Sequence, residues 1–134
     1  MSQTLANAEL AIMDLLWRNG RMTARDLREQ LYPDATKAQH GTVQRLLERL
    51  EKKAFVERDK NLSIHFFSPR VSREAYAGGQ LEELADKLTS GSIAPLITHL
   101  VEEKKISRDE IKRIRDMLNK LADQSSPKRR EGKS

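Results

Sequence analysis

Residues 36–53, TKAQHGTVQRLLERLEKK, constrain the fold of this chain more than any other stretch. Val43, Leu46, Leu47 and Leu50 recur at the spacing of a helix with one buried face. The opposite face carries hydrogen-bonding side chains first and cations later: Gln39, His40, Thr42, Gln44, Arg45, Arg49, Lys52 and Lys53. A helix in the major groove of DNA has this layout, with base-reading groups ahead of phosphate-binding cations. An ordinary helix with a solvated charged face is the alternative that this stretch alone leaves open.

The segments around this helix follow the order helix, helix, helix, hairpin. Helical periods are predicted for residues 5–18 and 23–32, which end at an Asn-Gly pair and at a Pro-Asp pair. Thr23 is the candidate cap of the second helix, where its side chain can accept from the N–H of Asp26. Beyond the third helix, residues 55–58 and 64–68 are short β-prone runs separated by a turn signal. This order predicts a winged helix-turn-helix in which the second and third helices form the motif and the hairpin forms the wing.

The predicted wing carries polar and cationic side chains at its tip. Arg58, Lys60 and Asn61 lie at or next to the turn. From there they are placed to contact a phosphate or the adjacent minor groove.

The charge of the chain favours a polyanionic partner for its first half. Its 134 residues carry a formal net charge of +5. Residues 1–70 hold 12 Lys and Arg against 9 Asp and Glu (+3), residues 71–122 hold 9 against 9 (0), and residues 123–134 hold 4 against 2 (+2). The excess in the first half predicts binding that weakens as salt rises.

Composition excludes several classes of protein. Aromatic residues make up 4% of the chain, which favours helices packed with Leu and Ile over a β-sandwich. The absence of cysteine excludes a disulfide framework and thiolate metal sites. No signal-peptide pattern and no apolar run of membrane-spanning length are present, so a cytoplasmic protein without membrane insertion is expected.

Three further helices are predicted after residue 71, with Ser72, Ser92 and Ser107 as candidate caps. Gly78 and Gly79 fall inside the first of them, where a kink, a break or a flexible joint is expected. The apolar stripes of the three helices provide the candidate dimer contacts: Leu81, Leu84, Leu88, Leu96, Ile97, Leu100, Ile111, Ile114 and Leu118.

These stripes hold more apolar side chains than a bundle of some fifty residues can hide on itself. A second copy of the chain would cover them, so a homodimer is predicted. Packing of the helices onto the first half of the same chain is the alternative. The predicted division is a winged-helix DNA-binding domain at residues 1–71, a helical dimerisation domain at residues 72–122 and a disordered basic tail at residues 123–134.

The sequence contains no arrangement of residues that indicates catalysis. His40, His65 and His99 lack the spacing of metal ligands, and no glycine-rich loop cradles a phosphate. The adjacent pairs Glu82-Glu83 and Glu102-Glu103 point different ways on their helices. No enzyme activity, no metal and no cofactor are predicted.

Four stretches resemble the penicillinase-repressor family of bacterial winged-helix regulators, which includes the methicillin-resistance and copper-responsive repressors. They are residues 5–17, 42–60, 65–69 and 106–121. The resemblance implies a mainly α fold with a small β-hairpin, namely a winged helix-turn-helix domain followed by a three-helix domain that dimerises with intertwined protomers. It also implies repression by occupation of inverted repeats in double-stranded operator DNA, typically with TACA/TGTA half-sites, at β-lactam-resistance or related stress genes.

In this family the start of the third helix reads bases. The matching positions are Gly41, Thr42, Gln44 and Arg45, and family members often carry Lys and Arg where this chain has Gly41 and Gln44. Arg45 is expected to compensate by pairing with guanine. The complete predicted DNA-binding set is Gln39, His40, Gly41, Thr42, Gln44, Arg45, Arg49, Arg58 and Lys60.

The resemblance also suggests how repression would be relieved. A membrane-bound metalloprotease sensor cleaves the family's β-lactam repressors at an Asn-Phe bond after a short turn, and the corresponding stretch here is Gly91, Ser92 and Ile93, without Asn-Phe. The copper-responsive branch uses a cysteine-rich motif that this chain lacks.

Two other functions remain open at the level of sequence. A ligand-sensing winged-helix regulator would bind a small phenolic or drug between its domains, using the joint at Gly78 and Gly79. A protein-interaction adaptor would use the winged helix without DNA.

Overall fold

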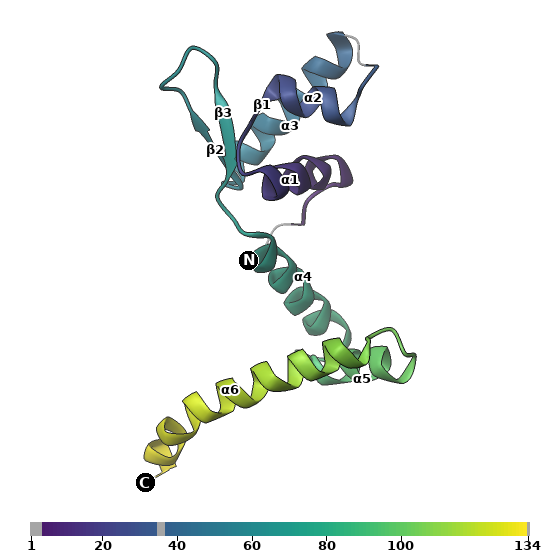
Figure 1. The fold of residues 1–134 in the computed structure, drawn as a ribbon, viewed down its shortest axis with the longest axis vertical. Coiled ribbons are helices and arrows are strands. Elements are labelled where there is room, and N and C mark those ends of the chain that lie inside the picture. The colour runs from purple at the N-terminus through teal and green to yellow at the C-terminus, as the bar shows by residue number, and fades with distance from the viewer. Residues whose placement is uncertain (1–3, 35–36, 134) are drawn as a thin grey trace.

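The computed structural model describes residues 4–34 and 37–133, which form six helices and three short strands (Figure 1). The fold is mainly α with a small sheet, as the sequence predicts. In chain order the elements are α1 (Asn7–Asn19), β1 (Met22–Thr23), α2 (Ala24–Leu31), α3 (Lys37–Lys52), β2 (Val56–Asp59), β3 (Phe66–Pro69), α4 (Arg73–Leu88), α5 (Ala94–Glu102) and α6 (Arg108–Lys133).

The sheet is antiparallel with strand order β1-β3-β2, so the hairpin gains a third strand. The two residues of β1 pair with β3 through Met22↔Phe67. The register of the hairpin runs from Val56↔Pro69 to Asp59↔Phe66, which leaves a six-residue loop at residues 60–65. The sequence placed the second hairpin strand at residues 64–68 and did not predict β1, because two residues are too short for a recognisable alternation.

The core lies where α1, α2 and α3 meet the sheet. Ile12, Leu27, Leu47 and Phe67 are each at most 2% exposed and come from four different elements. Burial of a side chain of this size contributes about 1.5–3 kcal/mol. Because each element supplies part of one shared core, α3 is held rigidly with its polar face outward.

A buried ion pair joins the start of α1 to the residue after α3. Glu9 is 1% exposed, accepts a hydrogen bond of 2.9 Å from the backbone N–H of Ala6, and lies 2.9 Å from Nζ of Lys53. Burial raises the pKa of the Glu9 carboxyl, but the Ala6 N–H and the charges of Lys53 and Arg49 outweigh it and hold this pKa below its ordinary value. The Glu9 carboxyl is therefore ionised at neutral pH and pairs with Lys53.

Three of the predicted helix caps are confirmed by hydrogen bonds, including Ser107, whose Oγ accepts from the N–H of Glu110 at 3.1 Å. Thr23 Oγ1 accepts from the N–H of Asp26 at 3.0 Å, and Asp26 Oδ2 accepts in return from the N–H of Thr23 at 3.2 Å. Ser72 Oγ accepts from the N–H of Ala75 at 3.0 Å, which starts α4. At α5 the residue in the cap position is Ile93, not the predicted Ser92, and it makes no side-chain cap bond.

The structure differs from the sequence prediction within α4. This helix runs from Arg73 to Leu88 through Gly78 and Gly79 without a break. Glu and Ala on both sides and Leu after the glycines are strong helix formers and outweigh a local cost of about 1 kcal/mol for each glycine. As a result α4 leads unbroken from the winged-helix unit toward α5 and α6 (Figure 1).

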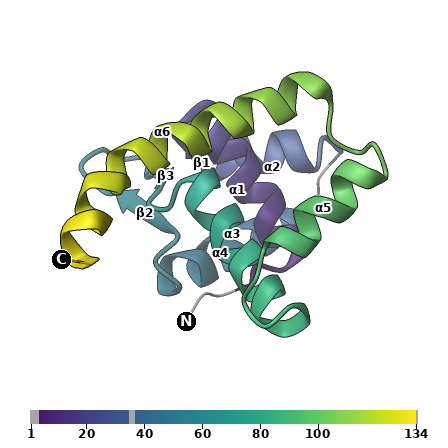
Figure 2. The same cartoon turned by 90° about the horizontal axis from the view of Figure 1, so that it is seen from below.

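The structure also differs at the C-terminus, where α6 continues to Lys133 although the sequence predicts a disordered tail from residue 123. Lys, Arg and Glu in this stretch favour a helix, whereas Pro127 and Gly132 oppose it, so local helix propensity alone does not account for the extension. In the predicted basic tail, the side chains of residues 124–134 lie outside the described part of the chain, as does residue 36, the predicted start of the third helix. Seen from below, α6 crosses the whole view from the α5–α6 loop to the C-terminus (Figure 2).

Candidate nucleic-acid interface

Helix α3 turns its apolar face inward, as the sequence predicts. Val43, Leu47 and Leu50 are fully buried, and Leu46 is buried to within a few per cent. On the other face His40, Arg45 and Arg49 are exposed, whereas Gly41, Thr42 and Gln44 are half-buried. Gln39, predicted on this face from the sequence, is half-buried one turn before Val43, on the side of the apolar stripe. The structure therefore brings the predicted base-reading residues together on one side of a single well-anchored helix.

Arg45 bends back along α3 toward its N-terminal turns. Its Nη2 donates to Oγ1 of Thr42 at 3.4 Å, and its Nη1 lies 3.5 Å from the place where a Cβ on Gly41 would stand. A Cβ at position 41 would therefore stand in ordinary van der Waals contact with the guanidinium. The group is thus held over the part of the helix that meets base edges when a helix docks in the major groove.

A cavity of about 330 Å³ separates α3 from the wing. His40 and Gln44 line it from α3, Arg25 from α2, and Ile64 and His65 from the wing. Hydrogen-bonding groups and cations from three elements thus converge on one hollow. A phosphate backbone fits such a surface because it offers many acceptors and negative charge.

Arg58 makes several contacts at the base of the wing. Its Nη2 lies 2.6 Å from Oε1 of Glu51, its Nη1 lies 3.3 Å from Nδ1 of His65, and its guanidinium carbon is 4.8 Å from the centre of the Phe67 ring. The guanidinium predicted to contact phosphate is therefore engaged with protein groups in this structure. These contacts join β2 to Glu51 of α3, to His65 and to Phe67 of β3, and sequence reasoning missed them.

The other predicted cations differ in their surroundings. Lys60 is exposed on the wing loop, where the N–H of Asn61 donates to Oδ1 of Asp59 at 2.9 Å and shapes the turn. Arg49 is exposed on α3, but its charge also acts on the buried carboxylate of Glu9. Lys60 is thus the cation best placed at the wing tip, and Arg49 lies toward the body of the domain.

The predicted dimer contacts are largely open to solvent. Among the described residues from 72 onward, only Ala85 is a buried hydrophobic residue. Leu84, Leu88 and Leu118 are 45%, 67% and 59% exposed. The remaining predicted contacts range from half-buried to exposed: Leu81, Leu96, Ile97, Leu100, Ile111 and Ile114.

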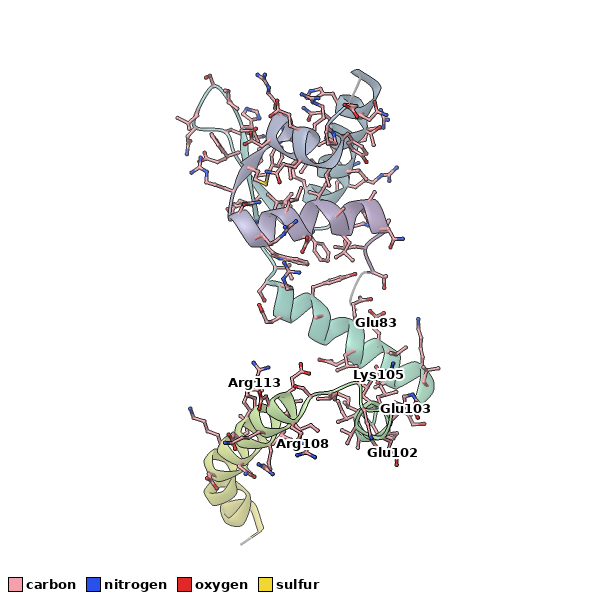
Figure 3. All side chains as sticks on the ribbon, turned by 45° about the vertical axis from the view of Figure 1, so that its right-hand side comes forward. Glu83, Glu102, Glu103, Lys105, Arg108 and Arg113 are labelled. Atoms are coloured by element: carbon pink, nitrogen blue, oxygen red, sulfur yellow. The ribbon has the colours of Figure 1, made fainter. Side chains whose placement is uncertain are left out.

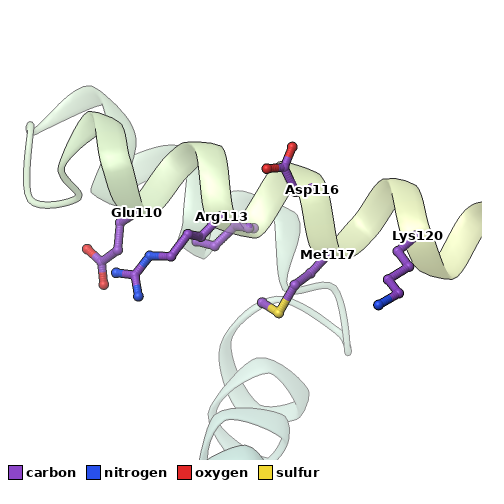
Figure 4. A pocket seen from close by; sticks show the side chains of 6 residues that line it. Glu110, Arg113, Asp116, Met117 and Lys120 are labelled. Atoms are coloured by element: carbon purple, nitrogen blue, oxygen red, sulfur yellow. The ribbon is translucent and has the colours of Figure 1, made fainter.

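Two hollows follow this apolar surface. One of about 270 Å³ lies between α5 and α6 and is lined by Ile97, Ile111 and Leu118. The other, of about 560 Å³, runs along α6 past Met117, with Glu110 and Lys120 at its two ends (Figure 4). Charged residues surround the place where α4, α5 and α6 meet, and Figure 3 labels six of them: Glu83, Glu102, Glu103, Lys105, Arg108 and Arg113. An apolar centre with a charged rim is the layout of a protein interface.

Four contacts clamp the start of α4 to α1, and we refer to them as the α1–α4 clamp. Trp17 Nε1 donates to the carbonyl of Val71 at 2.8 Å, and the hydroxyl of Tyr76 accepts from the N–H of Leu5 at 2.9 Å. Arg73 lies 2.9 Å from Oδ1 of Asp14 and stacks over the Trp17 ring at 5.0 Å. The hydrogen bond and charge of Arg73 hold the pKa of the Asp14 carboxyl below its ordinary value.

The sequence did not predict this clamp, because its partners are some 60 residues apart. The aromatic character of Trp17 and Tyr76, in a chain with so few aromatic residues, was the available signal.

The predicted cleavage stretch lies in the loop between α4 and α5. Gly91 and Ser92 are exposed and Ile93 is half-buried. Gly91 has φ +91°, a conformation that favours glycine, and Thr89 Oγ1 donates to the carbonyl of Ser92. The loop is thus a tight exposed turn.

Within the described ranges, no group of three or more His, Cys, Asp or Glu side chains is placed to hold a metal ion. Within the same ranges, no helix is both long and apolar enough to span a membrane.

Comparison with known proteins gives a consistent set of relatives. A family model described as penicillinase repressor matches residues 5–120. The transcriptional regulator BlaI of Mycobacterium tuberculosis is 34% identical over 119 residues, which cover 87% of this chain and 84% of BlaI. The methicillin resistance regulatory protein MecI of Staphylococcus aureus is 26% identical over 116 residues, covering 87% and 94%.

Solved structures with a similar path of the chain were also found. The reduced form of MarR from E. coli matches with a TM-score of 0.43 at 18% identity, covering 87% of this chain and 77% of that one. A mutant of ZitR from Lactococcus lactis matches with a TM-score of 0.43 at 17% identity, covering 92% and 77%.

Proposed function

Because the chain belongs to the penicillinase repressor family, whose members are transcriptional repressors and not enzymes, we propose that it is a homodimer that represses transcription by occupying palindromic operator DNA. The observation that carries this proposal is the polar face of α3, with the guanidinium of Arg45 held over the first turns of a helix whose other face is buried. A surface of this kind suits base recognition in the major groove.

In the proposed complex the N-terminal half of α3 reads bases and the wing contacts the backbone. Gly41 allows close approach, Thr42 and Gln44 offer hydrogen bonds, and Arg45 pairs with guanine O6 and N7. Lys60 neutralises a phosphate near the wing, and Arg49 adds long-range attraction. His40 lies at the start of the same face, whereas Gln39 lies one turn before Val43, on the side of the apolar stripe.

The exposed apolar face of α4, α5 and α6 supports the homodimer. Side chains such as Leu88 and Leu118 would be removed from water by a second copy, which has the same face to cover. A two-fold axis through this interface would set the two copies of α3 about one turn of DNA apart, roughly 34 Å. A palindromic operator has the matching symmetry, and a dimer on a promoter blocks polymerase sterically.

The relatives named for methicillin resistance and penicillinase suggest the class of genes that this chain regulates. We propose resistance or related stress genes, controlled in the cytoplasm. Cleavage by a membrane-bound metalloprotease sensor in the exposed turn at Gly91, Ser92 and Ile93 would separate α4 from α5 and α6, and would thereby divide the proposed dimer face.

The test is selection of bound sequences from randomised double-stranded DNA by the full chain, followed by gel shifts and sedimentation of the complex. We expect a palindrome with half-sites about one turn apart, bound by two copies of the chain. Recovery of no motif, with binding that ignores sequence, would overturn operator recognition and favour the adaptor function.

One observation favours a second function, that of a ligand-sensing regulator. A cavity of about 490 Å³ lies at the α1–α4 clamp and is lined by Trp17, Arg70 and Val71 among others. A ligand there would contact both the winged-helix unit and the start of α4. A small phenolic acid that raises the melting temperature and releases operator DNA would support this function, and an unchanged melting temperature at saturating phenolic acid would argue against it.

A further inference from the structure

The wing tip exposes two large aliphatic side chains. Leu62 is 55% exposed and Ile64 is 61% exposed. In the described part of residues 4–71, the only other exposed large hydrophobic residue is Leu10, at 36%. The two most exposed aliphatic side chains of the winged-helix unit therefore stand together on one loop, which projects beyond the three-helix body (Figure 1).

The base of this loop is held firmly. The pairing Asp59↔Phe66 closes it, the N–H of Asn61 bonds to Asp59 at 2.9 Å, and Arg58 ties β2 to Glu51. These contacts fix where the strands end. The aliphatic side chains are thus presented outward by an ordered support, and neither of them joins the core.

The surroundings favour DNA as the partner of these side chains. Ile64 lines the same cavity as His40, Gln44 and Arg25, so it borders the face that carries the recognition helix. The loop at residues 60–65 contains Lys60 and no acidic residue. A partner that is anionic and also has apolar surface satisfies both features.

The minor groove of DNA is such a partner. Its walls are deoxyribose rings between phosphates, and many proteins insert aliphatic wedges there, which partly unstack a base step. When a recognition helix lies in the major groove, a wing beside it reaches the adjacent minor groove.

We propose that Leu62 and Ile64 form an apolar wedge in the minor groove flanking each half-site, with Lys60 on the adjoining phosphate. This inference rests on the proposed function, because it requires α3 to be docked in the major groove. It adds a second kind of specificity. Flanks with flexible pyrimidine–purine steps deform readily, and the chain prefers them without any hydrogen bond to their bases.

The experiment compares Leu62→Ala and Ile64→Ala with the matched control Leu10→Ala in the full chain. Binding is measured on the selected operator across a range of salt, with 2-aminopurine placed in the flanking steps. Each wing variant is expected to bind about fivefold to tenfold more weakly because apolar contact is lost. The salt slope stays unchanged because no charge is removed. The 2-aminopurine signal that wild type induces falls, whereas Leu10→Ala behaves as wild type.

Three results would contradict the proposal that Leu62 and Ile64 insert into the minor groove. The wing variants could bind the operator as wild type does, or they could lose affinity without any change in 2-aminopurine fluorescence. They could also alter the association state of the protein but not its DNA affinity, which would show that the tip contacts a second protein. If wild type itself selects no operator, the proposed function fails first, and this outcome is distinct from the other three.

Discussion

The winged-helix unit at residues 4–71 and the three helices after it have the same kind of sequence pattern but differ in how far its apolar side chains are buried. Both contain helices with a regular apolar stripe. In the first unit the stripes of α1, α2 and α3 converge on one core and are nearly all buried. In the second, Leu84, Leu88 and Leu118 stay open to solvent. A periodic stripe thus tells which face of a helix avoids water, but not what covers that face.

This contrast explains how the proposed repressor divides its work. The first unit closes its core within one chain, so it can hold α3 rigidly as a monomer. The second unit lacks enough contacts of its own and gains them from a second copy in the proposed dimer. The first unit therefore determines the shape of the recognition surface, and in the proposal the second unit determines the two-fold symmetry of the dimer.

The largest effect that tests this contrast is expected from Leu47→Ala. Leu47 is fully buried in the core, so its truncation should lower the free energy of unfolding by about 2–5 kcal/mol. Chemical denaturation measures this change. The control is Leu88→Ala, which removes the same atoms from a side chain that is 67% exposed and should leave the unfolding of the first unit unchanged. An equal loss of unfolding free energy in the two variants would contradict the difference in burial between the two regions.

Leu118→Asp tests the open face. A buried charge at a dimer interface should raise the dimer dissociation constant about a hundredfold, equivalent to roughly 2.7 kcal/mol. Sedimentation at several concentrations measures it. Lys112→Gln on the same helix lowers the net charge by the same one unit outside the apolar stripe and serves as the control. A dimer that is indifferent to Leu118→Asp would place the interface elsewhere.

Arg45→Ala separates DNA recognition from assembly. Loss of a guanine contact should weaken operator binding by about 1–3 kcal/mol, while dimerisation stays intact. Gel shifts on the operator and on a scrambled duplex measure the specificity. An equal loss on both duplexes would assign Arg45 to phosphate contact.

Glu9→Gln is expected to have the smallest effect. The variant leaves Lys53 without its carboxylate partner, and because Lys53 is 30% exposed the loss should be about 1–2 kcal/mol at neutral pH. The folded-state pKa of Glu9 lies below its ordinary value of 4.5, so the carboxylate stabilises the fold above that pH. This contribution disappears as pH falls through the lower, folded-state pKa. Denaturation curves of wild type and variant should therefore converge in acid, and a constant gap would refute the ion-pair explanation.

Local patterns predicted most of the fold. Periodicity located the three N-terminal helices and the hairpin, and cap chemistry placed Thr23, Ser72 and Ser107 at helix starts. What the sequence missed depends on contacts between distant residues. Strand β1 exists only because β3 offers it a partner, and Glu9 meets Lys53 across 44 residues. Local rules also overestimated the effect of Gly78 and Gly79, which the rest of α4 overrides.

The sequence predicted which residues belong to the candidate site better than it predicted how their side chains are arranged. Apart from Gln39, the face of α3 contains the expected residues, since helix periodicity fixes which side chains share a side. The inward turn of Arg58 toward Glu51 depends on how the strand crosses the helix, and no spacing rule gives that. Occupation of the apolar face by a second copy stays a prediction.

The α1–α4 clamp has a consequence for how mutations in this chain would alter the operator that the proposed dimer binds. Because Trp17, Tyr76 and Arg73 lock the start of α4 to the winged-helix unit, this 16-residue helix works as a rod about 24 Å long. In the proposed dimer, one residue inserted into α4 would rotate the winged-helix unit by about 100° about the helix axis and move it by about 1.5 Å along that axis. In that proposed dimer the length of α4 would set the distance between half-sites, and the surface of α3 would set their sequence. Mutation can change one of these properties while the other stays as it was.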